Sequence, residues 1–147
     1  MEPTEPRPDV DIEEDIKQII HSFSPLQASR AYFTVHSENG VVTLKGNVRN
    51  PQARRVMVDN IPRIEGVKAV ISDAFFDDEM IRFKVGELLP PGVHASVMFG
   101  AVALTGRLPS GASADIIIKA IAEIPGVLRV GADFGTVREA PLKSDSQ

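Results

Sequence analysis

The sequence predicts an α+β fold of two tandem αββαβ units, each with a three-stranded mixed sheet and two helices packed on one face. Three observations predict it. The second half of the 147-residue chain repeats the first half at a shift of sixty positions. Each half contains segments with the apolar spacing of an amphipathic helix and segments with the alternation of a half-buried strand. Hydrophobic residues make up 43% of the chain, which is enough to build a core.

The repeat falls on glycines and apolar residues, which turns and interior packing require. Before the paired glycines the shift changes from sixty to sixty-five, so the first copy has the longer connection between its first helix and first strand. At a shift of sixty the pairs include Gly40 and Gly100, Leu44 and Leu104, Gly46 and Gly106, Ile61 and Ile121, Ile64 and Ile124, and Gly66 and Gly126.

The first helix and the hairpin of the first copy follow from spacing and turn residues. Apolar residues recur at helical spacing from Ile12 to Phe23, after an acidic first turn that the helix dipole favours. This pattern predicts an amphipathic helix that begins near Asp11. The alternating segments 33–36 and 41–48 flank Asn39-Gly40, which predicts a two-residue hairpin turn because both residues tolerate positive φ.

A second helix and a third strand complete the first copy. Asn50 followed by Pro51 supplies an N-cap and a first-turn proline, and Gly66 is expected to end the helix. The β-branched segment 67–74 predicts a strand. The second copy is predicted to repeat this order over 77–89, 93–98, 101–108, 112–124 and 127–134.

The repeat also predicts the domain boundaries. Units of about sixty residues are only marginally stable alone, so we expect the copies to pack on each other, with Phe75 and Phe76 in the contact between them. The expected parts are a disordered tail at 1–10, a first domain at 11–76, a second domain at 77–137 and a disordered tail at 138–147.

The glycine, the alternating apolar residues and the Leu-x-Gly of the hairpin, followed by a helix that ends in Gly-Val and a strand, resemble the BON domain. The resemblance occurs twice and covers nearly all of the folded part. In the first copy it rests on Gly40, Val42, Leu44, Gly46, Val48, Ala53, Ile64, Gly66, Val67 and Val70. In the second copy it rests on Gly100, Val102, Leu104, Gly106, Leu108, Ile124, Gly126, Val127 and Val130.

The resemblance implies an αββαβ fold, a bacterial protein of the stress-response kind, and non-enzymatic binding of phospholipid membranes or envelope proteins. One branch of the family implies potassium binding. Many relatives are exported to the periplasm, but no basic-then-apolar signal and no lipobox cysteine precedes the first copy. We therefore expect a cytoplasmic location, or one peripheral to the membrane.

Composition and spacing argue against several classes of function. A net charge of -4 argues against a nucleic-acid partner, and the absence of cysteine excludes thiol chemistry and thiolate zinc sites. His21, His36 and His94 come from different elements and are interpreted as surface histidines. The acidic runs at 11–15 and 77–79 lie at helix starts, where the dipole explains them. We therefore expect no catalytic residues, no metal site and no cofactor.

A basic cluster is the first candidate binding feature. Lys45, Arg49, Arg54 and Arg55 are grouped around the second strand and the following helix of the first copy. Such a cluster is suited to an anionic headgroup or an acidic partner, and the alternative interpretation is a solvated helix face.

An apolar hairpin tip is the second candidate. Met98 and Phe99 stand where the first copy has Glu38 and Asn39, and the expected pairing puts Met98 beside Ala101 on the uncovered face. A hairpin tip is not apolar without a reason. The alternatives are burial against the first copy, a homo-oligomer contact, a protein partner and shallow insertion into a bilayer. Three consecutive isoleucines, 116–118, likewise cannot all face one core.

Together these features predict a non-enzymatic binding module. It would associate with a phospholipid membrane surface or a protein partner through the apolar hairpin of the second repeat and the basic cluster of the first. The alternative function is cytoplasmic potassium sensing, since a site made of backbone carbonyls leaves almost no trace in a sequence.

Overall fold

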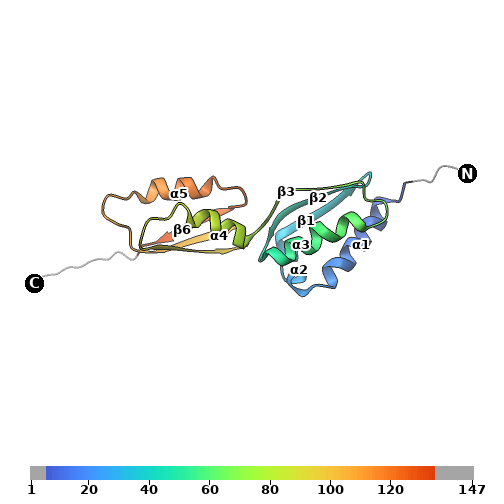
Figure 1. The fold of residues 1–147 in the computed structure, drawn as a ribbon, viewed down its shortest axis with the longest axis horizontal. Coiled ribbons are helices and arrows are strands. Elements are labelled where there is room, and N and C mark those ends of the chain that lie inside the picture. The colour runs from blue at the N-terminus through green and yellow to red at the C-terminus, as the bar shows by residue number, and fades with distance from the viewer. Residues whose placement is uncertain (1–5, 135–147) are drawn as a thin grey trace, which may run out of the picture. The chain divides into compact units, whose positions relative to one another are not determined.

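The computed structural model describes residues 6–134 and divides the chain into two compact units, Met1–Glu79 and Met80–Gln147. Each unit contains one three-stranded mixed sheet whose helices cover one face (Figure 1). The predicted fold class, two tandem αββαβ units, is confirmed. The predicted C-terminal tail, 138–147, lies outside the described residues, as do residues 1–5 of the predicted N-terminal tail.

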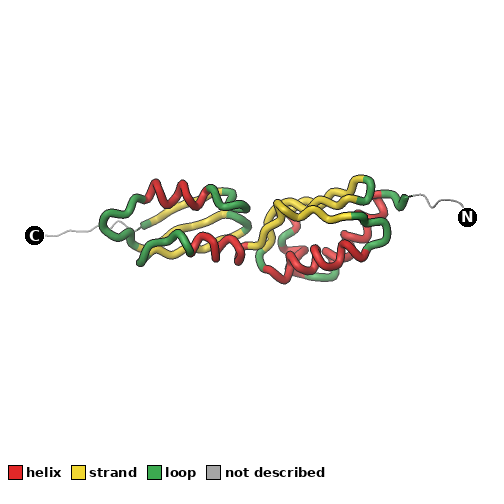
Figure 2. The backbone as a smooth tube through the Cα atoms, turned by 45° about the horizontal axis from the view of Figure 1, so that its top comes forward, coloured by secondary structure: helices red, strands yellow, loops and turns green. Residues whose placement is uncertain are grey.

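The first unit adds short helical segments to the predicted order. Its helical elements are α1 (Asp9–His21), α2 (Ser24–Ala28), the 3-10 turn η1 (Arg30–Tyr32), α3 (Pro51–Asn60) and the 3-10 turn η2 (Ile61–Arg63). Its strands are β1 (Phe33–Glu38), β2 (Val41–Val48) and β3 (Ala69–Asp77). β2 is the central strand, antiparallel to β1 and parallel to β3. Figure 2 shows the strands as one layer and the helices as another.

The second unit has the predicted elements without the additional helix. They are α4 (Asp78–Gly86), β4 (Val93–Met98), β5 (Ala101–Gly106), α5 (Ala114–Ala122) and β6 (Arg129–Asp133). β5 is the central strand, antiparallel to β4 and parallel to β6. Both sheets therefore have the same topology, as a duplicated fold requires.

The start of α1 is held to the β1–β2 hairpin by one side chain. The helix begins at Asp9, two residues before the expected start. The Asp9 carboxylate accepts hydrogen bonds from the Ser37 hydroxyl at 2.7 Å and from the backbone N–H groups of Asn39 at 2.7 Å and Gly40 at 3.0 Å. These donors, led by Ser37, lower the pKa of Asp9 because they favour its ionised form.

Helix α3 begins as predicted and ends early. The Asn50 side chain accepts a hydrogen bond from the N–H of Ala53 at 2.8 Å, and Pro51 occupies the first turn. The α-helix ends at Asn60 and continues as the 3-10 turn η2, before the Gly66 predicted to end it. Pro62 explains the difference, because it has no N–H to donate to the carbonyl oxygen of Val58 in a continued α-helix.

Two repeated glycines permit a close approach between the strands of each hairpin. Gly46 and Gly106 have φ of 123° and 107°. A Cβ at Gly46 would collide with the carbonyl oxygen of Tyr32, and one at Gly106 would collide with that of Gly92. The repeat at these positions is therefore a steric requirement of the fold.

The core of the first unit lies between the sheet and its helices, and it includes a residue that we expected elsewhere. Phe75, predicted to lie in a contact between the units, is fully buried in the core of the first unit. Its ring meets that of Phe33 edge to face, with centroids 5.8 Å apart. The prediction was wrong because β3 continues past Ala74 to Asp77. The buried cluster is Ile12, Ile16, Ile20, Leu26, Phe33, Val42, Leu44, Val48, Ala53, Met57, Ile61 and Phe75.

The second unit has a smaller buried set. Ile81 and Val85 of α4 and Ile121 of α5 are buried with four residues of the β4–β5 hairpin, Val93, Val97, Val102 and Leu104. No described residue of this unit takes the place of Leu26, which α2 inserts fully into the first core. Ile116 is 70% exposed, so the expectation that the isoleucines at 116–118 do not all face one core is confirmed.

Candidate functional site

Three apolar residues lie at the hairpin end of the second sheet, and we call them the apolar tip. Met98 and Phe99 belong to the β4–β5 hairpin, and Leu128 directly precedes β6. Met98 is 60% exposed, Leu128 is 64% exposed and Phe99 is half-buried. The N–H of Leu128 donates to the carbonyl oxygen of Gly100 at 2.8 Å, which holds Leu128 beside the turn. Residues 98 and 128, thirty positions apart, are thus brought to the same end of the sheet.

The first unit has polar residues at the same three places. Glu38 and Asn39 precede Gly40 in its turn, and the N–H of Lys68 donates to the carbonyl oxygen of Gly40 at 2.8 Å. The backbone contact is the same in both units. The side chains there are Glu38, Asn39 and Lys68 in the first unit and Met98, Phe99 and Leu128 in the second. The two tips therefore differ in their side chains and share their backbone arrangement.

Phe99 has a backbone conformation that does not suit it. Its φ is 49°, and Asn39 has nearly the same value, 53°. Asparagine tolerates the left-handed region, whereas a bulky residue there is a conformational outlier that costs about 1–2 kcal/mol. An unfavourable residue that is kept at an apolar surface points to a function for that surface.

A cation lies beside the apolar tip. The strand register aligns Met98 with Ala101 and Ala101 with Arg129, so the three residues form one row on the sheet face that the helices leave uncovered. The pairing that we predicted, Met98 with Ala101, is confirmed. An apolar side chain and a positive charge thus lie on the same face, on either side of the central strand β5.

Two members of the predicted basic cluster are engaged within the first unit. The Arg49 guanidinium pairs with the Asp78 carboxylate at 2.9 Å, where Asp78 is only 5% exposed. The Arg54 guanidinium donates to the carbonyl oxygens of Phe75 at 2.8 Å and Ser72 at 3.4 Å, and lies 5.9 Å from the centroid of the Phe75 ring. Both side chains help to fix the end of β3.

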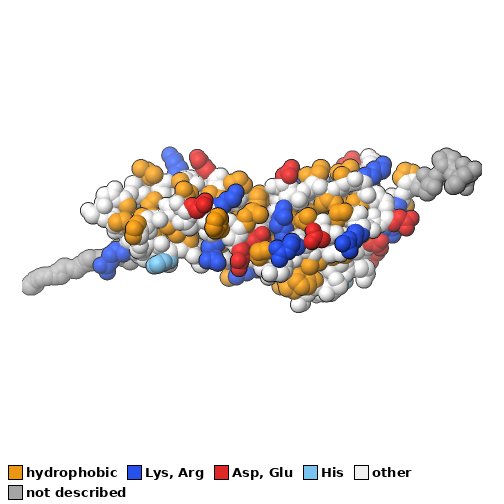
Figure 3. All heavy atoms as spheres, in the orientation of Figure 1, with side chains coloured by type: hydrophobic (Ala, Val, Ile, Leu, Met, Phe, Trp, Pro, Cys, Tyr) orange, Lys and Arg blue, Asp and Glu red, His pale blue; other side chains and the backbone are white. Residues whose placement is uncertain are grey.

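The other two members lie on opposite sides of the sheet. Lys45 alternates with the buried Leu44 in β2, so it is exposed on the face that the helices leave free. Arg55 is on α3, which covers the other face, and lines a shallow hollow with Gln52 and Asp59. The four basic residues therefore form no single patch. Figure 3 shows blue side chains over α3 with acidic ones between them.

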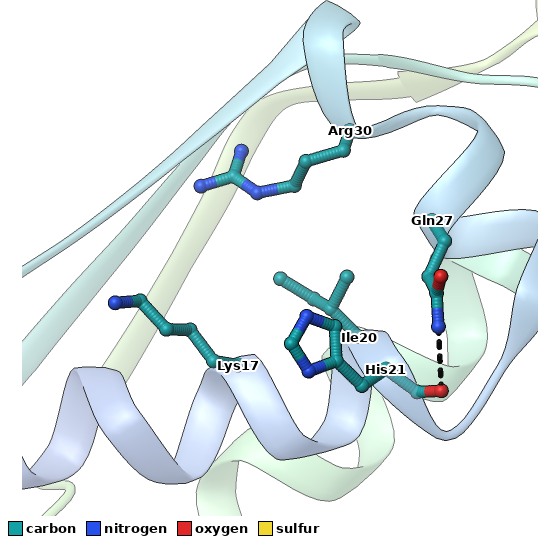
Figure 4. Close-up of a pocket in the computed structure, with 5 residues that line it drawn as sticks. All are labelled: Lys17, Ile20, His21, Gln27 and Arg30. Atoms are coloured by element: carbon teal, nitrogen blue, oxygen red, sulfur yellow. Dashed lines mark hydrogen bonds between the residues drawn. The ribbon is translucent and has the colours of Figure 1, made fainter.

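A second candidate site was missed by sequence reasoning. Lys17, Ile20, His21, Gln27 and Arg30 line a hollow of about 470 Å³ between α1, α2 and η1 (Figure 4). His21 was interpreted as an ordinary surface residue. The sequence held no signal for this hollow, because α2 and η1 fall in the connection where the two copies do not align. Leu128 was also missed, although the shift of sixty pairs it with Lys68.

Within residues 6–134 the three histidines lie on three different elements, α1, β1 and β4. His21, His36 and His94 are all exposed, and the His36 ring nitrogens lie 3.7 Å from carboxylate oxygens of Glu13 and Glu38. In that part of the chain no three histidine or acidic residues are grouped so that they would hold a metal ion. None of its helices has the length and apolar character needed to cross a membrane. Potassium binding through carbonyls stays a prediction.

The fold defines a duplicated α+β protein with one three-stranded mixed sheet in each unit. The model of the BON domain family matches residues 8–74 and again 77–138. The chain therefore belongs to the BON domain family and carries two tandem BON domains, which are generally non-enzymatic binding domains. The resemblance that the sequence indicated is confirmed.

Comparison with solved structures finds a similar fold. A structure of CdsD, a structural protein of the Type III secretion system of Chlamydia trachomatis, gives a TM-score of 0.63 at 14% identity. The match covers 86% of this chain and 62% of that chain, so this chain spans less than two thirds of its length. The C-terminal domain of CdsD gives a TM-score of 0.34 at 15% identity, over 85% of this chain and 96% of that one. None of the curated proteins matches.

Proposed function

We propose that this protein is a non-enzymatic binding module whose apolar tip contacts a phospholipid membrane surface. The observation that carries the proposal is the exchange of Glu38, Asn39 and Lys68 for an apolar tip at the same three places of the second unit. Arg129 beside the tip and exposed cations such as Lys45 would add attraction to anionic headgroups. A peripheral association of this kind needs no membrane-spanning helix.

The size of the apolar tip fits weak and reversible association. Full burial of one Met, Leu or Phe side chain contributes about 1.5–3 kcal/mol. Because Met98 and Leu128 are 60% and 64% exposed, and Phe99 less so, insertion of the three would contribute on the order of 3–5 kcal/mol. The net charge of -4 opposes approach to an anionic surface, so we expect binding to depend on the tip as well as on local cations.

Co-sedimentation of the full chain with vesicles tests this proposal. We expect the wild type to bind vesicles of equal phosphatidylcholine and phosphatidylglycerol, and Phe99→Asp to bind about tenfold less, because a carboxylate at the tip disfavours insertion. Asn39→Asp introduces the same charge at the same turn position of the first unit, and we expect it to bind like the wild type. Equal losses in both variants, or no binding by the wild type, would contradict the proposal.

A protein partner is the second candidate for the same apolar tip. The similar fold of CdsD, described as a structural protein of a secretion system, supports this form. A photoreactive residue at position 98 would then give a defined adduct with one protein in cells of the native host, and Phe99→Asp would abolish it. The absence of any adduct at position 98, together with an adduct from a probe at position 38, would count against it.

A further inference from the structure

We propose that the hollow between α1, α2 and η1 of the first unit binds a small organic anion, namely an apolar body that carries a phosphate or carboxylate group. The site involves none of the residues of the apolar tip and is independent of its function. Its volume of about 470 Å³ falls in the range of small-molecule sites, about 300–1,000 Å³.

Nitrogen donors from two elements, α1 and η1, line this hollow. Lys17 and His21 are four residues apart on α1 and therefore share one helix face, and Arg30 reaches over the hollow from η1 (Figure 4). The Arg30 guanidinium lies 5.1 Å from the centroid of the Phe33 ring and donates one hydrogen bond, at 2.9 Å, to the carbonyl oxygen of Phe33. A guanidinium has five N–H donors, so the Arg30 side chain is held in place with donors left for a ligand.

Nearby acids leave the positive character of the hollow in place. Glu13, which lines an adjoining hollow with Lys17 and Arg30, accepts the N–H of Ser37 at 2.8 Å. Glu14 lies 3.9 Å from Lys17, and both side chains are about 60% exposed, so solvent screens this pair. An anion in the hollow would meet two permanent cations and an imidazole that can donate a hydrogen bond.

The floor of the hollow favours a ligand with an apolar part. Ile20 is 3% exposed and forms the floor. In Figure 4 the aliphatic stems of Lys17 and Arg30 extend to the same side, with their charged ends away from Gln27. A ligand that places an apolar body on Ile20 and its charge beside these ends would use both kinds of surface.

The additional segment of the first unit builds this hollow. The Gln27 side chain donates to the carbonyl oxygen of His21 at 2.7 Å, which fixes α2 against the end of α1. At the shift of sixty-five, Arg82 and Gly86 of α4 take the places of Lys17 and His21, and the second unit has no described helix like α2. The hollow therefore distinguishes the two units as clearly as the apolar tip does.

An NMR titration of the full chain tests the inference with phenyl phosphate, inorganic phosphate and benzyl alcohol. Phenyl phosphate should shift the amide signals of residues 17–21 and 27–30, and it should bind at least fivefold more tightly than inorganic phosphate. Benzyl alcohol, which has the ring without the charge, should cause no such shifts. Shifts with phenyl phosphate that fall outside both segments would overturn the proposal.

Two exposed residues of the hollow provide variants that keep the fold. We expect Lys17→Gln and His21→Gln each to weaken phenyl phosphate binding by about tenfold, since each removes a donor to the anion. Lys84→Gln makes the same charge change in the last turn of α4 and should leave binding unchanged. Equal weakening in all three variants would show general electrostatics instead of a site, and would overturn the proposal.

The same two variants separate a free anion from a lipid headgroup. If the ligand is a free organic anion, Lys17→Gln binds phosphatidylglycerol vesicles like the wild type while it loses phenyl phosphate. If the ligand is a headgroup, vesicle binding falls together with phenyl phosphate binding. Full retention of both activities in Lys17→Gln and His21→Gln would reject anion recognition by the hollow, whatever the apolar tip does.

Discussion

Phe99 and Asn39 occupy the same place in two hairpins and differ in how well they fit it. Both have φ near 50°, and only asparagine takes that conformation readily. In the second unit an aromatic residue is kept at some cost to the turn. A residue that adds contact surface and lowers the stability of its turn is typical of binding surfaces.

The substitution Phe99→Asn separates stability from binding. We expect the free energy of unfolding to rise by about 0.5–1 kcal/mol because the left-handed strain is relieved, while vesicle binding falls about tenfold. Urea unfolding and co-sedimentation measure the two effects. The reverse change in the first unit, Asn39→Phe, should lower stability by about 1 kcal/mol. A loss of stability in Phe99→Asn would show that the ring supports the fold.

Asp9 makes the stability of the first unit depend on pH. Its pKa is lowered in the folded state, chiefly by the Ser37 hydroxyl and also by the backbone N–H groups of Gly40 and Asn39. Its contribution is therefore fully present above the unfolded value near 3.8 and is lost as the pH falls through the lower folded value.

The variant Asp9→Asn tests this dependence. At pH 7 the variant should unfold at lower urea concentration than the wild type, and the gap should close as the pH falls below about 4. Asp11→Asn, at an exposed position of the same helix, controls for the general loss of an acid. A gap that stays constant from pH 7 to pH 3 would be inconsistent with this role.

The residues of the site were predictable only in part. Met98 and Phe99 could be found because the repeat sets them against Glu38 and Asn39. The roles of Arg49 and Arg54 could not, because a sequence does not reveal that a guanidinium is engaged by Asp78 or by the carbonyl oxygens of β3. Charge type is visible in a sequence, whereas the partner that satisfies the charge depends on tertiary structure.

At the scale of elements, the helix α2 accounts for the main difference between the two cores. It inserts Leu26, which is fully buried, between α1 and the sheet of the first unit. In the second unit Phe83 is 71% exposed and Leu88 is 43% exposed. The five-residue helix α2 is thus the main reason that the core of the first unit is more closed than the core of the second unit.

Truncation of Leu26 tests the contribution of α2. We expect Leu26→Ala to lower the free energy of unfolding of the first unit by about 2–5 kcal/mol, through lost apolar burial and the cavity left behind. Leu88→Ala removes the same atoms from an exposed position and should cost less than about 1 kcal/mol. Urea unfolding followed by circular dichroism measures both, and similar small losses would mean that α2 does not close the core.

The element order was predictable because local signals agreed with one another. Asn39-Gly40 fixed the hairpin register, and Asn50-Pro51 fixed the start of α3. The ends of elements were less predictable. The helix α3 ended before Gly66 because Pro62 interrupts it. The strand β3 continued to Asp77, which places Phe75 in the core. Strand ends depend on tertiary packing, which periodicity alone does not contain.

At the scale of the whole molecule, the duplication has given two units of one fold with different surfaces. The first unit has polar residues at its hairpin tip and a cationic hollow beside α1. Among residues 6–134, six of the nine exposed large hydrophobic residues lie in the second unit, namely Met80, Phe83, Leu88, Met98, Ile116 and Leu128. This division is consistent with a first unit specialised for anions and a second unit specialised for apolar contact.

We propose that the apolar tip contacts the membrane surface and that the matching tip of the first unit does not. The most direct test is an NMR spectrum of the full chain with vesicles of phosphatidylcholine and phosphatidylglycerol that contain a spin-labelled lipid. We expect the signals of residues 98–101 and 127–129 to be broadened and those of residues 38–41 and 67–69 to remain sharp. Equal broadening at both tips, or broadening confined to other residues, would contradict this proposal.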